Sequence, residues 1–199
     1  MRYLIVCLIT LTIMSCKDKT KDKTKDKILQ EKVLKKGTYR ATLEVQDNEQ
    51  LPFIFEVISP TELHIFNAEE VIIVDEIVYR NDSVFIKTPV FESYIAAVFD
   101  GDNLKGGFIN KTRKRISPFT AEYQNVNRFS PASEAMENVT GIWETVFSKG
   151  TKGEYFARGS FEQHDGKVTG TFRTTTGDYR FLEGGVVDDI MMRVIDVIN

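Results

Sequence analysis

Apolar and polar residues alternate with a period of two from Gly37 onward. In the run 37–45, Tyr39, Ala41, Leu43 and Val45 alternate with polar neighbours. Such spacing places successive side chains on opposite faces and predicts a half-buried strand. Turn residues separate further runs of this kind at 51–57, 62–66, 71–79, 83–88, 94–99, 104–110 and 118–123. Residues 37–124 are therefore expected to form a mostly β module of about eight antiparallel strands, as an up-and-down barrel or a two-sheet sandwich.

A second β module is expected after a short linker. Residues 125–139 break the alternation, and Ser130-Pro131 followed by 132–136 suits a short capped helix. Strand patterns return within 140–199 and end in an apolar stretch at 190–198; the predicted strands are 141–147, 154–163, 168–175 and 179–187. Four or five strands form a small sheet with a free edge, so the second module is expected to be incomplete.

Two local phrases recur in the two modules. Gly37-Thr38-Tyr39 resembles Gly141-Ile142-Trp143, because each has a glycine at the start of a strand and a large aromatic residue two places on. The stretch 104–108 (LKGGF) likewise resembles 168–172 (VTGTF). The spacing between the two similar segments differs between the modules. Either a distant duplication or sequence patterns common to β-barrels in general would explain the similarity.

The N-terminus has the organisation of a lipoprotein signal. Arg2 precedes an apolar run at 3–14, which is shorter than the roughly 20 residues of a membrane-spanning helix. Ile13-Met14-Ser15-Cys16 resembles the lipobox of bacterial lipoproteins, so residues 1–15 are expected to be removed and Cys16 to carry the lipid. The run 17–27 (KDKTKDKTKDK) has nothing to bury, and residues 16–36 are interpreted as a charged, solvated tether.

Composition and charge exclude several classes of function. The formal net charge is −3, so no basic face is indicated and nucleic acid is not an expected partner. Both cysteines, Cys7 and Cys16, lie in the first 16 residues. The predicted β modules therefore contain no disulfide, no Cys-x-x-Cys pair and no thiolate metal site.

Few residues suggest chemistry. His64 and His164 lie in separate modules without ligand spacing and are interpreted as strand-face residues. The acidic pairs do not form carboxylate dyads, because neighbouring strand residues point to opposite faces; they are Glu69-Glu70, Asp75-Glu76 and Asp188-Asp189. The basic stretch 111–115 is interpreted as a solvated hairpin loop, with a binding patch as the alternative. Trp143, the only tryptophan, is interpreted as a core residue, with the lining of a ligand cavity as the alternative.

Six short segments carry a family resemblance: 51–55 (LPFIF), 67–70 (NAEE), 74–77 (VDEI), 82–84 (DSV), 89–91 (PVF) and 166–184 (GKVTGTFRTTTGDYRFLEG). Together they resemble the membrane-proximal region of TlpA-like lipoprotein thiol-disulfide oxidoreductases of Bacteroidetes, a thioredoxin-like family. The resemblance covers about 37–183. It implies further β structure and then a redox domain with Cys-x-x-Cys, which this sequence lacks, so the chain is expected to be truncated before that domain.

We therefore expect a non-catalytic, lipid-anchored β protein of the cell envelope, attached to a membrane outside the cytoplasm. Cys16 is the one site residue predicted; no catalytic, cofactor-binding or metal-binding residue is expected. The resemblance implies an envelope redox protein as a candidate partner, beside the membrane itself. The alternative is a stand-alone lipoprotein that binds a small hydrophobic ligand inside the barrel.

Overall fold

The computed structural model describes residues 32–45, 49–89, 92–129, 137–187 and 191–192. Within these residues the chain forms strands joined by turns and connecting segments, in two sheets. The strands are β1 (Gly37–Glu44), β2 (Gln50–Ser59), β3 (Glu62–Asn67), β4 (Glu70–Val74), β5 (Glu76–Arg80), β6 (Ser83–Lys87), β7 (Ser93–Asp100), β8 (Asn103–Asn110), β9 (Arg115–Tyr123), β10 (Gly141–Phe147), β11 (Tyr155–His164), β12 (Lys167–Thr174), β13 (Asp178–Val187) and β14 (Met191–Met192). The mostly β fold class is confirmed.

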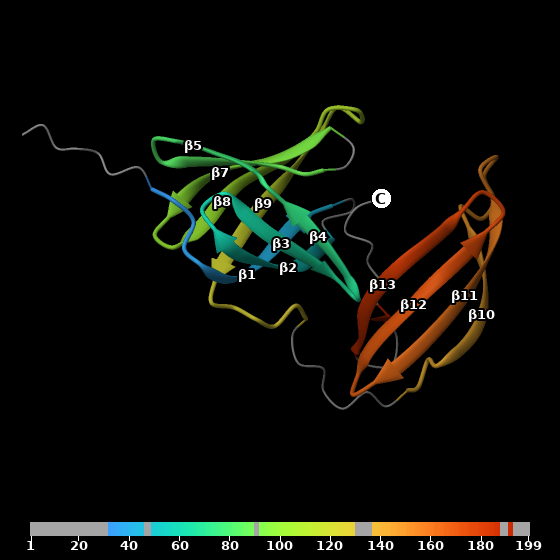
Figure 1. Cartoon of the computed structure of the whole chain (residues 1–199). Coiled ribbons are helices and arrows are strands. Elements are labelled where there is room, and N and C mark those ends of the chain that lie inside the picture. Colours follow the sequence, from blue (N-terminus) through green and yellow to red (C-terminus); the bar gives the residue numbers. More distant parts are fainter. Residues whose placement is uncertain (1–31, 46–48, 90–91, 130–136, 188–190, 193–199) are drawn as a thin grey trace, which may run out of the picture.

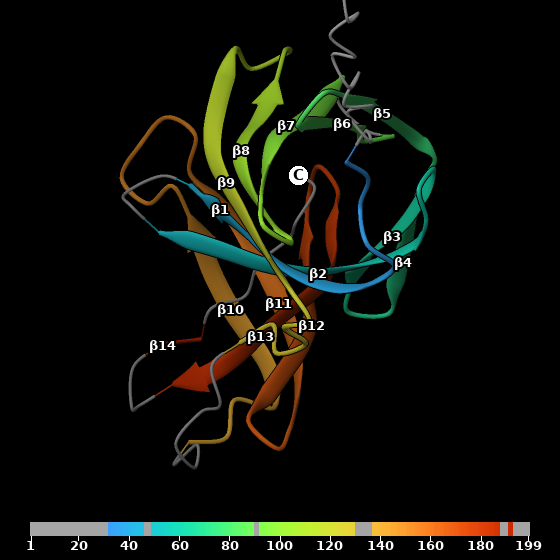
Figure 2. The same cartoon turned by 90° about the vertical axis from the view of Figure 1, so that its left-hand side faces the viewer.

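The first nine strands form one nearly closed antiparallel sheet. Their order is β4-β3-β2-β1-β9-β8-β7-β6-β5, so the first and last strands of the module, β1 and β9, pair with each other. The sheet curves round so that its two outer strands, β4 and β5, are joined through Asp75 without pairing, and the strands enclose a common interior (Figures 1 and 2). The first module is thus a barrel that is open only between β4 and β5.

The expected strand at 71–79 is two strands in the structure. Asp75 alone separates β4 from β5. β4 pairs with β3, whereas β5 pairs with β6. A stretch that is continuous in its hydrophobic pattern thus crosses from one outer edge of the sheet to the other, and this raises the strand count of the module from the expected eight to nine.

Aromatic side chains fill the barrel interior. Tyr39 on β1 lies opposite Phe55 on β2 in the register, and their rings stack with centroids 4.9 Å apart. Phe53 contacts both Phe55 and Phe119 on β9. Each of these four rings is at most 2% exposed. A cavity of ligand size would leave its lining accessible, so the described side chains pack this part of the interior themselves.

The residues ahead of β1 are fastened to one end of the barrel. Leu34 is 2% exposed and packs into the core, although it precedes the first strand. Its backbone N–H donates to the Tyr79 hydroxyl (3.4 Å), which donates to the Pro60 carbonyl (2.7 Å). The Tyr123 hydroxyl donates to the Lys36 carbonyl (3.1 Å). The chain therefore enters the barrel at a fixed place.

Burial of the Tyr39 hydroxyl predicts a loss of stability in alkali. Burial raises the pKa of Tyr39 from about 10 to about 12, although a hydrogen bond from the Lys35 N–H acts in the opposite direction. Between these values the folded state holds a proton that the unfolded chain has lost. The free energy of unfolding should therefore fall as pH rises from about 10 to about 12, by at most about 1.4 kcal/mol per pH unit from this group.

Chemical denaturation at a series of pH values would measure this slope. Tyr79 contributes in the same direction, because burial also raises its pKa. The Tyr39→Phe variant should show a shallower decline than the parent while the contribution of Tyr79 persists. An equal decline in both proteins would contradict the assignment to Tyr39.

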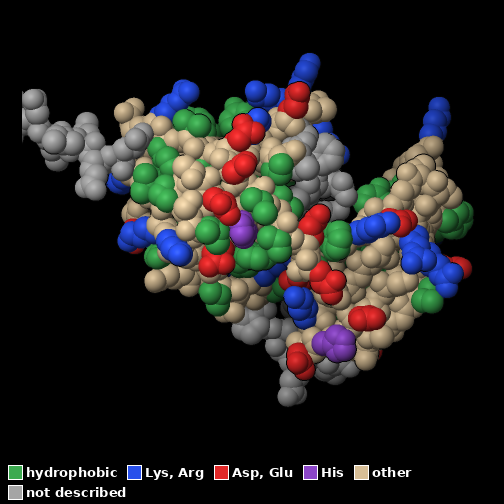
Figure 3. Space-filling view, in the orientation of Figure 1, with side chains coloured by type: hydrophobic (Ala, Val, Ile, Leu, Met, Phe, Trp, Pro, Cys, Tyr) green, Lys and Arg blue, Asp and Glu red, His purple; other side chains and the backbone are tan. Residues whose placement is uncertain are grey.

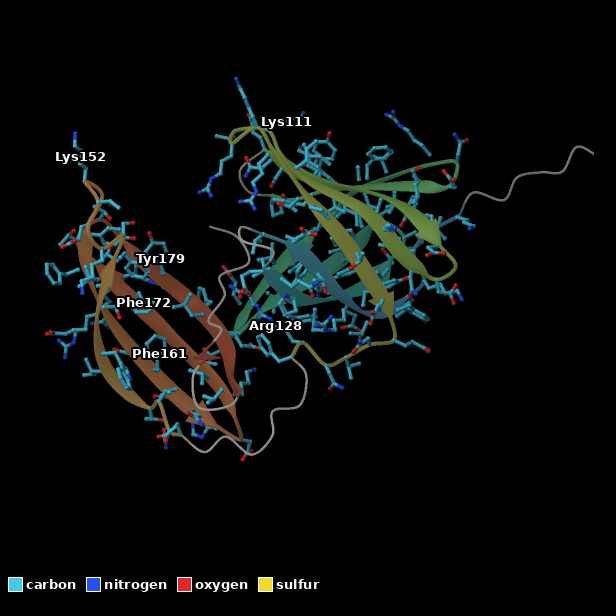
Figure 4. All side chains as sticks on the ribbon, turned by 180° about the vertical axis from the view of Figure 1, so that it is seen from behind. Lys111, Arg128, Lys152, Phe161, Phe172 and Tyr179 are labelled. Atoms are coloured by element: carbon cyan, nitrogen blue, oxygen red, sulfur yellow. The ribbon has the colours of Figure 1, made fainter. Side chains whose placement is uncertain are left out.

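The second module is a five-stranded sheet in the order β10-β11-β12-β13-β14. Its small core is formed by Phe161, Val168, Leu182 and Val186. Figure 4 shows Phe161, Phe172 and Tyr179 along this sheet, and the rings of Phe161 and Phe172 meet edge to face with centroids 5.2 Å apart. In the described residues this sheet stays open, unlike the barrel.

The two phrases shared by the modules also share backbone and packing features. Gly37 and Gly141, which begin β1 and β10, both have positive φ angles, 131° and 140°. Gly106 and Gly170 both lie against the neighbouring strand so closely that a Cβ would collide with it. In each module a glycine thus begins the first strand, and another lets two strands approach closely.

Some predicted features lie outside the described residues. These are the signal segment 1–15, Cys16, the repeat 17–27, the helix at 131–136, Asp188-Asp189, and residues 190 and 193–198 of the apolar terminal stretch. Residues 191–192 form β14, which pairs with β13.

Candidate functional site

Arg128 joins the barrel to the second sheet. It follows β9 and is 7% exposed. Its Nε donates to the Pro52 carbonyl on β2 (3.0 Å), and its own carbonyl accepts from Arg40 Nε on β1 (3.2 Å). Its Nη1 lies 3.5 Å from Glu183 Oε1 on β13. Figure 4 shows Arg128 between the two modules. We refer to Arg128, Glu183 and their contacts as the junction.

The junction is a buried charge pair with incomplete hydrogen bonding. Glu183 also lies 3.1 Å from Lys167 Nζ, whose side chain is more than half exposed. Arg128 Nη1 and Nη2 are buried and have no hydrogen-bond partner in the described part of the chain. Burial lowers the pKa of Arg128, whereas the charge of Glu183 raises it. This arrangement orients the modules, and nothing in its chemistry indicates a reaction.

A second candidate is formed by exposed apolar residues on the edge strand β10 and on its neighbour β11. Ile142, Trp143 and Phe156 are 61%, 50% and 70% exposed. The Trp143 indole N–H donates to the Val139 carbonyl (2.9 Å), but half of the side chain faces solvent. The interpretation of Trp143 as a core residue is therefore wrong: its strand lies at the edge of a sheet and receives cover from one side only.

Aromatic rings continue from Trp143 across one face of the sheet, whereas Ile142 and Phe156 lie on the opposite face. Phe147 at the end of β10 contacts Tyr155, Phe172 and Tyr179, with centroids 5.2, 5.1 and 6.1 Å away. The Tyr155 and Tyr179 hydroxyls lie 3.1 Å apart, and this hydrogen bond raises the pKa of Tyr155. The rings are only partly buried. Such a surface suits recognition of another apolar or aromatic surface.

The two histidines lie in different modules and have different surroundings. His64 on β3 is hydrogen-bonded through Nε2 to Glu62 Oε1 (2.8 Å), and His164 is an exposed residue at the end of β11. Figure 3 shows them on separate modules. Both are strand residues, as predicted. Among the described residues no group of three or more His, Cys, Asp or Glu side chains could hold a metal ion.

The charged segments occupy turns and strand ends. Glu69 lies in the turn before β4, and Glu76 pairs across the strands with Lys87 (2.6 Å), where both side chains are exposed. Residues 111–114 form the turn between β8 and β9, and Arg115 begins β9. The hairpin-loop interpretation of 111–115 is confirmed for 111–114. These groups are solvated, and none of them forms an ion pair with Arg128 or Glu183 in the described part of the chain.

Neither a membrane-spanning helix nor a matching protein adds to this picture of the described residues. In the part of the chain that is described, no helix has the length and apolarity needed to cross a membrane. No protein-family model, curated protein or solved structure matches the chain. The resemblance to TlpA-like proteins thus rests on the sequence phrases alone.

Proposed function

We propose that this protein is a non-catalytic, lipid-anchored β scaffold of the cell envelope, related to the membrane-proximal region of TlpA-like thiol-disulfide oxidoreductases. It recognises a protein partner through its outer surface. One observation carries the proposal: the described barrel side chains fill their own interior, while apolar side chains are exposed along β10 and β11. Recognition therefore falls to the outside of the molecule.

The place where the chain enters the barrel supports the role of a tethered scaffold. Leu34 and the backbone of residues 34–36 are held against the barrel end by tyrosine hydroxyls. An anchor at Cys16 would then connect to a fixed point on the barrel through the charged segment 17–27. The junction at Arg128 holds the second module in a defined position relative to that point.

The family resemblance suggests an envelope redox protein as the partner. Disulfide exchange needs an attacking thiolate, and no cysteine follows Cys16 in this sequence. The scaffold would accordingly bind a dithiol protein and hold it in place, and it would not carry out disulfide exchange itself. The alternative, a small hydrophobic ligand inside the barrel, would require the packed rings around Phe55 to separate, and the contacts described here give it less support.

The anchor is tested by the Cys16→Ser variant. The parent chain should incorporate radiolabelled fatty acid and fractionate with membranes, because the thiol of Cys16 accepts the lipid. The variant should lose the label and leave the membrane fraction. The Cys7→Ser variant is the matched control, since Cys7 lies in the segment expected to be removed. Unchanged labelling of the Cys16 variant would refute the anchor.

The partner is tested by a photo-crosslinking residue at Phe156, whose side chain is 70% exposed. The probe is carried by the full chain in its own cells, and a second probe at Val98 on the outside of β7 is the control. We expect products at position 156 that contain an envelope protein with a Cys-x-x-Cys pair. Products that contain only copies of this chain, or the same products from both positions, would argue against a redox partner.

A further inference from the structure

Among the described residues β10 has one neighbouring strand, whereas β1, which begins with a similar sequence, has two. β1 pairs with β2 on one side and with β9 on the other. β10, which also begins with a glycine of positive φ, pairs with β11 and lies at the edge of its sheet in the described residues. No strand among the described residues pairs with the opposite edge of β10. β10 contains no proline and no lysine, the residues that commonly protect such edges.

The barrel also shows what the second neighbour of such a strand provides. Tyr39, two residues after Gly37, lies directly opposite Tyr123 of β9, and the two ring centroids are 5.0 Å apart. With Phe55 on its other side, Tyr39 is 1% exposed. Trp143, two residues after Gly141, is 50% exposed, and no strand in the described part of the chain lies beside it on the outer side. An aromatic residue on an added strand would cover Trp143 in the way that Tyr123 covers Tyr39.

We propose that the open edge of β10 pairs antiparallel with β10 of a second copy of this chain, with the two-fold axis at Thr145. In this register Trp143 lies opposite Phe147 of the other copy, and the reverse pair is its symmetry mate. Both residues lie on the face that carries Tyr155 and Phe172. The aromatic face then continues across the interface. Two identical strands related by a two-fold axis can meet only in this antiparallel way.

The other pairs in this register are compatible with it. Thr145 faces Thr145, which is a favourable cross-strand pair. Glu144 faces Val146, so the two Glu144 carboxylates avoid direct opposition. Shifting the axis to Glu144 would place these like charges opposite each other, and it would leave Trp143 opposite Thr145. The sequence of β10 therefore favours the Thr145-centred register. The inference goes beyond the proposed function and does not depend on a redox partner.

Single cysteines on β10 test the register in the full chain. In intact cells treated with a permeant oxidant, we expect roughly tenfold more disulfide dimer from Thr145→Cys than from Glu144→Cys or Val146→Cys, because a disulfide needs Cα atoms about 4.4–6.8 Å apart. Co-expression of the Glu144→Cys and Val146→Cys chains should restore dimer formation. The Cys7→Ser chain without added cysteine is the parent, and any dimer that it forms reports a free Cys16, which is a failure of the anchor and not of the pairing.

A charge exchange at the axis provides the second test. Adding Thr145→Lys to both the Glu144→Cys and Val146→Cys chains should abolish the mixed dimer, because the two lysines face each other. Replacing one of them by Thr145→Glu should restore it. Circular dichroism of each variant checks that the sheet is intact. Equal dimer yields at positions 144, 145 and 146, no dimer from folded variants, or crosslinks only to other proteins would overturn the proposal.

Discussion

Replacing Phe55 by alanine should cost the barrel about 3–5 kcal/mol of unfolding free energy. Phe55 is 1% exposed and contacts the rings of Tyr39 and Phe53, so the substitution removes apolar burial and leaves a cavity between β1 and β2. A loss of this size is a large part of the typical stability of a domain. Denaturant unfolding followed by far-ultraviolet circular dichroism measures it.

The same substitution at Phe156 is the matched control. That ring is 70% exposed on β11, so its removal should change the unfolding free energy by no more than about 0.5 kcal/mol. If Phe55→Ala were as mild as Phe156→Ala, the barrel interior would have to be less densely packed than the ring contacts indicate, and the ligand alternative would gain support.

Replacing Arg128 by alanine should uncouple the two modules. Removing one partner of a buried ion pair costs about 3–5 kcal/mol, and Lys167, which remains 3.1 Å from Glu183, should keep the loss near the lower end. The hydrogen bond to the Pro52 carbonyl is lost as well. Trp143 is the only tryptophan, so its fluorescence reports the second module alone. We expect its unfolding transition to lie at lower denaturant than the later part of the circular dichroism transition, which contains the signal of both sheets.

Two further variants separate the buried pair from its exposed neighbour. Lys167→Ala removes a largely exposed contact and should cost less than about 1 kcal/mol. The double variant Arg128→Met with Glu183→Leu leaves no unpaired charge and should recover much of the loss. Coincident transitions in the Arg128→Ala protein, together with an unchanged midpoint, would mean that the junction does not hold the modules together.

Strand positions could be predicted because burial on one face leaves a period of two in the sequence. The strands β1, β3 and β6 lie within a residue or two of the predicted ranges for this reason. The division at Asp75 could not be predicted in the same way. Residues 71–79 carry a continuous strand pattern, and a change of pairing partner from β3 to β6 leaves no trace in the alternation.

The junction was not predicted, since its local sequence gives no indication of burial. Arg128 stands between Asn127 and Phe129 in the expected linker, where no strand alternation marks a buried position. Its environment is supplied by Pro52 and Glu183, which are distant in the sequence. Leu34 likewise falls in the range 16–36 that the charged repeat 17–27 predicts to be a solvated tether. Trp143 shows the opposite error: its residue type favours a core, but its strand lies at the edge of a sheet. In each case long-range contacts outweigh composition.

The pairing of β1 with β9 has a mechanical consequence. The chain enters the barrel at Gly37 and leaves it after Tyr123, and these points lie at the same end. Tension between the N-terminal segment and the second module would thus bypass most of the barrel. The contacts of Leu34 and Arg128 would carry it first. The bonds from Tyr123 Oη to the Lys36 carbonyl and from the Gln124 N–H to the Thr38 carbonyl would follow. Under load these bonds would separate one after another, as in unzipping, so the barrel would peel apart at low force rather than resist shear.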